Sequence, residues 1–176
     1  MKESTKVQLQ QMHAAYTARL QAVIARERAK KKAQQAFLDD FQGLGDDVIR
    51  PVMEEFRSFL ASVGTEASVI NEKSESPEEY WHGTPTGGTY IAFVLKEANN
   101  NLEYHQHSNN RVVFAANPDT LRIVLSVYGS SGGGPTGAEY SIGTLSRDLV
   151  EDEILDGIGR ITASSPNVWG LDIGSD

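Results

Sequence analysis

The first forty residues carry apolar positions at helical spacing. Residues 3–41 include no glycine or proline and are rich in Ala, Gln, Lys, Arg and Leu, so they favour one long helix. Apolar side chains recur along it at intervals of three and four and line one face: Leu9, Met12, Tyr16, Leu20, Val23 and Ile24. Between Ala25 and Gln35 only alanines are apolar, which indicates a solvated segment or one that touches a charged partner. The pattern predicts a basic, amphipathic helical arm over residues 1–42.

A second helical pattern follows Gly43-Leu44-Gly45. These glycines are predicted to break the first helix, and Asp46 or Asp47 to cap the next one. Pro51 falls in the first turn, where its missing N–H costs nothing, and Gly64 suits a left-handed helix end. The apolar positions of this helix are expected in the core: Val48, Val52, Phe56, Phe59, Leu60 and Val63.

Alternating and β-rich runs occupy the middle of the chain. They cover residues 67–71, 89–97, 102–107, 111–116, 121–128 and 139–145. Clusters of Asn, Asp and Pro between several of them favour tight reversals, and short connections require antiparallel neighbours. We therefore expect a meander of five or six strands.

A last amphipathic helix is predicted over roughly residues 147–161, capped by Ser146 or Thr144. Its apolar side chains stack on one side of the helix: Val150, Ile154, Ile158 and Ile161. The fold class is therefore α+β: a long N-terminal helix, a second helix, an antiparallel sheet and a C-terminal helix packed on the sheet. Residues 43–162 are predicted to form the compact domain, and residues 163–176 an extended or disordered tail.

Charge is distributed unevenly along the chain. The net charge is −8, yet residues 1–36 hold eight basic and two acidic residues and are +6, which leaves −14 for the rest. Such asymmetry suggests a basic arm that meets an anionic partner: nucleic acid, a membrane surface or an acidic protein face. An exposed basic helix docked on the protein's own acidic body explains it equally well. The cations available for nucleic-acid contact are Arg26, Arg28, Lys30, Lys31 and Lys32.

Composition excludes several classes of protein. The chain has no cysteine, which removes disulfides, thiolate nucleophiles and cysteine-ligated metal sites. No stretch approaches the roughly 18 apolar residues of a membrane span, and Met1-Lys2-Glu3-Ser4-Thr5 lacks the apolar core of a signal peptide. We expect neither membrane insertion nor secretion, and a cytoplasmic location.

The candidate chemistry is confined to a few histidines. His105 and His107 lie two apart on a predicted strand and share a face, so they could bind a divalent ion if His82 or Glu103 supplied a third ligand. An exposed polar strand end explains the same pattern more simply, so we expect no metal and no cofactor. The glycine-rich stretches at 43–47, 82–88 and 129–137 lack the features of a phosphate-binding loop.

These patterns favour a non-enzymatic protein-interaction module: an adaptor, a chaperone-like protein or an accessory subunit. The predicted contact residues, for a partner protein or a homo-oligomer, are Leu9, Met12, Tyr16, Leu20, Val23 and Trp81. Trp81 lies beside Gly and Pro, where an aromatic side chain can anchor a protein contact, although it can also cap the sheet core. The alternatives are a nucleic-acid-associated protein that contacts phosphates through the basic arm and, third, a His-dependent metal hydrolase.

Overall fold

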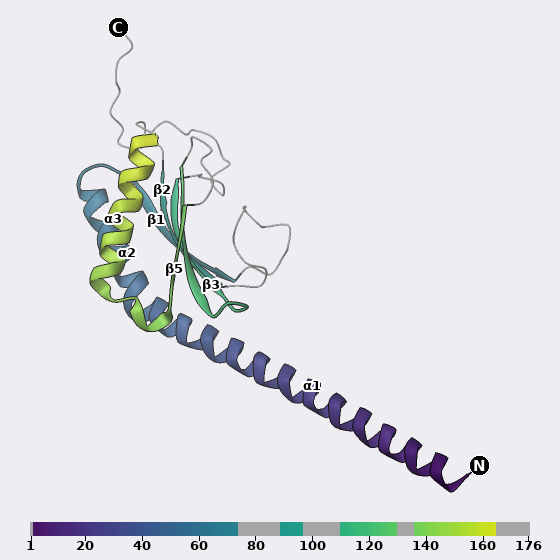
Figure 1. The fold of residues 1–176 in the computed structure, drawn as a ribbon. Coiled ribbons are helices and arrows are strands. Elements are labelled where there is room, and N and C mark those ends of the chain that lie inside the picture. The colour runs from purple at the N-terminus through teal and green to yellow at the C-terminus, as the bar shows by residue number, and fades with distance from the viewer. Residues whose placement is uncertain (1, 74–88, 97–109, 130–135, 165–176) are drawn as a thin grey trace. The chain divides into compact units, whose positions relative to one another are not determined.

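A computed structural model describes residues 2–73, 89–96, 110–129 and 136–164. The elements follow the order α1 (Glu3–Leu44), η1 (Gly45–Ile49), α2 (Arg50–Ser62), β1 (Ala67–Lys73), β2 (Thr89–Leu95), β3 (Arg111–Asn117), β4 (Arg122–Tyr128), β5 (Thr136–Tyr140), η4 (Ile142–Thr144) and α3 (Arg147–Ser164) (Figure 1). Two compact units, Met1–Ala36 and Phe37–Asp176, make up the chain. The predicted α+β fold is confirmed.

The five strands form one antiparallel meander in the order β1-β2-β3-β4-β5. Between β3 and β4 the chain reverses because the Asn117 side-chain oxygen accepts the backbone N–H groups of Asp119 (3.1 Å) and Thr120 (3.3 Å). Leu121 completes this turn at a φ of 54°, a left-handed conformation that is unusual for leucine. The strand expected at 102–107 lies outside the described residues.

The last strand is displaced from its predicted position. A strand was expected at 139–145, whereas β5 ends at Tyr140 and a single 3-10 turn follows. The Ser141 carbonyl accepts the backbone N–H of Thr144 (3.0 Å) and its hydroxyl (2.7 Å). These local bonds close a turn in place of a ladder, so the predicted extension to residue 145 is wrong.

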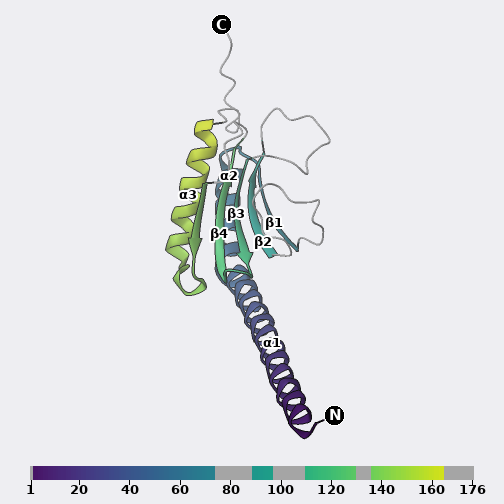
Figure 2. The same ribbon diagram turned by 45° about the vertical axis from the view of Figure 1, so that its right-hand side comes forward.

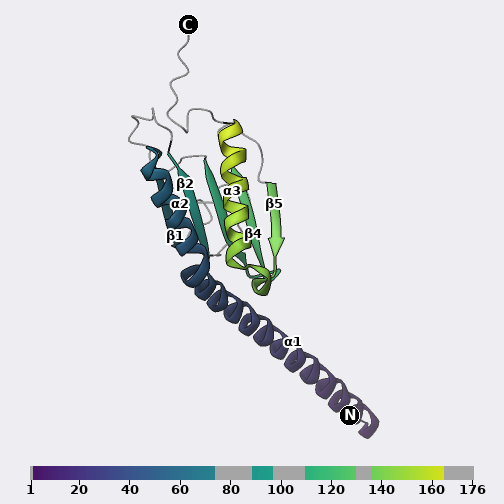
Figure 3. The same ribbon diagram turned by 90° about the vertical axis from the view of Figure 1, so that its left-hand side faces the viewer.

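Helices α2 and α3 cover one face of the sheet and lie side by side (Figures 2 and 3). The face of α3 that meets the strands is the predicted one, and all four of its side chains are at most 6% exposed: Val150, Ile154, Ile158 and Ile161. Ser146 caps this helix, since its hydroxyl oxygen accepts the N–H of Leu149 (3.3 Å). From α2, the Phe56 ring packs edge-on against Phe93 of β2, with ring centroids 6.4 Å apart.

The opposite face of the sheet carries a second, smaller apolar cluster. Its buried members are Ala92, Val94, Val113 and Ala115, with Ile70, Tyr90 and Tyr128 packed beside them. At its margin the Arg111 guanidinium lies over the Tyr128 ring, 4.5 Å from the centroid. Burial lowers the pKa of Arg111, and the nearby Tyr128 and Tyr90 oppose that shift.

The helix does not break at Gly43-Leu44-Gly45, so that prediction is wrong. Helix α1 continues into η1, a π-helical turn, and on into α2, and the Arg50 N–H bonds the Gly45 carbonyl five residues back. Because the ring of Pro51 would collide with a carbonyl in a regular α-helix, the wider turn before it accommodates the proline. Gly45 allows close packing, since a Cβ there would lie 2.5 Å from the terminal methyl carbon of Ile91 and would force that side chain to shift.

The predicted caps and core of α2 are confirmed only in part. No side-chain cap precedes the helix, and Asp46 pairs with Arg50 at 3.0 Å instead of capping. At the other end, Gly64 has a φ of 85° and stops the helix as expected. Phe59 and Val63 were expected in the core but are 65% and 56% exposed. Val52 and Leu60 are buried as expected, at 0% and 3% exposure, and the half-buried Phe56 packs against the core. Ile49 and Met53, both 0% exposed, take the core positions that the prediction missed.

Candidate protein-interaction surface

The apolar side chains of the first unit are exposed. We define the apolar stripe as five of them, with relative exposures of 50%, 68%, 66%, 47% and 59% in chain order: Leu9, Met12, Tyr16, Leu20 and Val23. Ile24 lies beside the stripe and is 42% exposed. The helix that carries them is regular from Glu3 onward, because nothing in this segment interrupts its backbone hydrogen bonds.

Helix geometry places the stripe on a single face. At about 100° per residue, its five side chains fall within an arc of about 80°. Val7 lies on the opposite side and is isolated from them. A contiguous exposed apolar surface of this kind is typical of a contact site.

The second feature of this helix is the basic run, defined as Arg26, Arg28, Lys30, Lys31 and Lys32, all of which are exposed. The same geometry distributes these five cations around the whole helix axis. A phosphate backbone approaching from any side would meet some of them, but no single face presents them all. The basic run therefore offers a diffuse positive potential and no shaped anion site.

Other predicted site residues fall where the structure gives no description. Two sets of candidates lie outside the described residues: Trp81, the sixth predicted partner-contact residue, and the possible metal ligands His82, Glu103, His105 and His107. Within the described ranges, no group of three or more His, Cys, Asp or Glu side chains could hold a metal ion. The prediction that the protein binds no metal stays a prediction.

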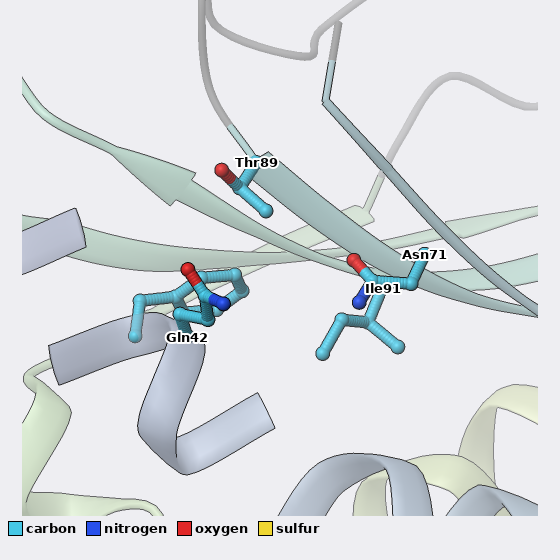
Figure 4. Close-up of a pocket in the computed structure, with 5 residues that line it drawn as sticks. Gln42, Asn71, Thr89 and Ile91 are labelled. Atoms are coloured by element: carbon cyan, nitrogen blue, oxygen red, sulfur yellow. The ribbon is translucent and has the colours of Figure 1, made fainter. Parts of the chain in front are cut away.

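A hollow of about 170 Å³ lies in the second unit where the end of α1 meets β1 and β2 (Figure 4). Its polar lining consists of the amides of Gln42 and Asn71 and the hydroxyl of Thr89, beside Phe41 and Ile91. Amides and a lone hydroxyl can bind polar groups, but they supply neither a general base nor an activated nucleophile. This hollow gives no support to an enzyme function.

The pKa of Tyr140 in the second unit is raised where this residue of a strand contacts a helix. The Tyr140 hydroxyl of β5 donates a hydrogen bond to the Glu153 carboxylate of α3. Burial, and then that hydrogen bond, raise the pKa of Tyr140 to about 12. The phenol therefore stays protonated, and able to donate this hydrogen bond, even in mildly alkaline solution, and the bond joins α3 to the edge strand β5.

An exposed ion pair joins the two helices. Arg147 of α3 lies 2.5 Å from the Glu55 carboxylate of α2 and 2.9 Å from Glu151. Glu55, then Glu151, raise the pKa of this already cationic arginine. Because all three side chains are in contact with water, these ion pairs contribute little to stability.

Sequence reasoning missed a second set of exposed apolar side chains. Phe59 of α2, Val63 directly after α2, and Leu155 of α3, which is 61% exposed, all lie outside the core. The spacing of apolar residues could have indicated the exposure of Phe59. A row of apolar side chains with intervals of four, three and four runs through Ile49, Met53, Phe56 and Leu60. Phe59 lies at the margin of that row. Val63 follows the last helical residue.

Comparisons of the chain with protein-family models, with curated protein sequences and with solved structures find no match. Among the described helices, none is both long and apolar enough to cross a membrane.

Proposed function

We propose that this protein is a non-enzymatic interaction module, an adaptor, chaperone-like protein or accessory subunit, that binds through its N-terminal helix. The observation that carries this proposal is the apolar stripe, whose five side chains share one helix face and are 47% to 68% exposed. Fully burying one such side chain contributes about 1.5–3 kcal/mol. At half exposure about 1 kcal/mol remains to be gained per residue, or about 5 kcal/mol for the stripe.

That gain sets the expected strength of the contact. Association costs about 4–15 kcal/mol in lost translational and rotational freedom, so one stripe against an inert surface is marginal. A partner with an apolar stripe of its own doubles the gain to about 10 kcal/mol. We therefore expect a reversible contact that depends on protein concentration.

The test changes the stripe and leaves the rest of the helix alone. Leu20→Glu combined with Val23→Glu puts two charges into the stripe and is expected to lower the assembly state measured by sedimentation over a concentration series. The matched control, Ala22→Glu with Ala25→Glu, has the same spacing and charge but lies on the other side of the helix, and is expected to leave assembly unchanged. A wild-type protein that is monomeric throughout, with partner binding that survives the stripe change, would refute the proposal.

The basic run supports a second candidate function, association with nucleic acid. Five exposed cations within seven residues would release counterions from a phosphate backbone, so binding would weaken steeply as salt rises. Contacts through the apolar stripe are instead tolerant of salt. A steep log–log slope of affinity for duplex DNA or RNA against salt concentration, made shallower by about three in the combined variant Lys30→Gln, Lys31→Gln and Lys32→Gln, would favour this candidate.

A further inference from the structure

We propose that the partner of the apolar stripe is the stripe of a second copy of this chain, and that the two helices pair antiparallel with Tyr16 at the two-fold axis. This inference rests on the proposed function and names its partner. It is carried by two independent properties of the helix: the order of its apolar positions and the placement of its charges.

The apolar positions read the same in both directions. From Leu9 to Val23 they follow one another at intervals of three, four, four and three residues, which is symmetric about Tyr16. When two copies run antiparallel about that residue, Leu9 of each chain faces Val23 of the other. Met12 then faces Leu20, and Tyr16 faces itself. A two-fold interface requires such a self-complementary surface.

The mean interval is also suitable for helix pairing. Four intervals cover fourteen residues, which gives 3.5 residues per interval, the spacing that keeps an apolar seam against a neighbouring helix. All five side chains are exposed along the seam, so every facing pair is available for contact. The seam extends about 21 Å at 1.5 Å per residue.

Charge selects the antiparallel orientation over the parallel one. In a parallel pair the basic run of each chain would lie beside its own copy, bringing ten cations together. In the antiparallel pair the two basic runs, centred near residue 29, are about 39 Å apart along the axis, well beyond the screening length of about 8–10 Å. Each run then lies beside residues 2–6 of the partner helix, where Lys2, Glu3 and Lys6 sum to +1, in place of the five cations that it would meet in a parallel pair.

The lack of cysteine in the sequence makes a direct test possible, because each introduced thiol is unique. Full-length Leu9→Cys and Val23→Cys proteins, one carrying a size tag, are mixed and oxidised. A disulfide needs Cα atoms within about 7 Å, a condition that positions 9 and 23 satisfy only across an antiparallel pair. We expect the mixed product to exceed either homodimer at least tenfold. Met12→Cys with Leu20→Cys provides an independent second pair with the same expectation.

Tyr16→Cys provides the reference, because position 16 faces itself in both orientations and reports pairing alone. If Tyr16→Cys cross-links and Leu9→Cys couples mainly to itself, the helices are parallel and the inference is wrong, while the proposed function stands. If no variant cross-links and the wild-type chain sediments as a monomer, a second copy is not the partner, and the inference is again overturned. In that case the proposed function is decided separately, by the effect of the double glutamate change on partner binding.

Discussion

Two glycines in α3 allow the packing of this helix on the sheet to be measured. Gly157 is buried, and a Cβ built on it would lie 2.5 Å from a methyl carbon of Val112 in β3 and 3.4 Å from one of Val127 in β4. Gly159 is exposed, and a Cβ there would meet nothing within 4 Å. Both residues lie inside the helix, so the same substitution probes two different surroundings.

Replacing either glycine with alanine gains about 0.8–1 kcal/mol of helix propensity. For Gly159→Ala this is the whole effect, and the free energy of unfolding is expected to rise by about 1 kcal/mol. Gly157→Ala must also displace Val112, which is 0% exposed and whose branched side chain has few alternative rotamers. Overpacking of this kind costs about 1–3 kcal/mol, so the two variants should differ by that amount.

Urea unfolding of the full-length variants measures this difference as a shift in midpoint at constant slope. Thermal unfolding should separate the two variants by at least a few degrees. A double-mutant cycle identifies the cause: Val112→Ala should relieve Gly157→Ala by about 1 kcal/mol or more, and should be additive with Gly159→Ala. Equal stabilisation by both alanines would refute the tight approach of α3 to β3.

Two further predictions concern the second unit. Because the pKa of Tyr140 is raised to about 12 from an ordinary value of 10.0, the folded state holds this proton more tightly, so its contribution to the free energy of unfolding is lost as pH rises from about 10 to about 12. Tyr140→Phe should therefore reduce the loss of unfolding free energy at alkaline pH, measured by urea titration. Identical pH profiles for the wild-type protein and the variant would contradict the hydrogen bond between Tyr140 and Glu153. Deleting residues 1–36 should leave a cooperative thermal transition, whereas deleting six more removes Phe37 and Phe41, which are 6% and 0% exposed, and should abolish it; loss of the transition already in the shorter deletion would place the arm in the core.

Sequence patterns predicted the fold well where a single periodicity operated without competition. The four apolar positions of α3 and its Ser146 cap are as predicted, because a helix lying on a sheet buries one row of side chains at intervals of three and four. The reversal between β3 and β4 also followed from the turn-forming residues that begin at Asn117. The helix cap and the turn depend on hydrogen bonds between residues close in the sequence, so they form whatever packs beside them.

The predictions failed where one segment could adopt two local conformations and its surroundings or hydrogen bonds determined which one formed. The rule that glycine ends a helix predicted a break at Gly43 and Gly45, yet Gly45 gives the helix room against Ile91 and the chain stays helical. The rule considers the conformational freedom of glycine, whereas at Gly45 the small size of the residue is what matters. Likewise the strand expected at 139–145 yielded to a turn closed by Ser141 and Thr144, whose hydrogen bonds the apolar pattern does not encode.

The candidate site exposes a deeper limit of the same reasoning. The stripe of α1 and the buried row of α3 have the same kind of spacing, yet the α3 side chains are at most 6% exposed and those of the stripe at least 47%. An amphipathic pattern predicts that a helix makes a contact, but not whether the contacting surface belongs to the same chain. In α3 the sheet supplies that surface. The exposure of the stripe turns the same pattern into an argument for a partner, and the symmetry of its intervals about Tyr16 favours an identical one.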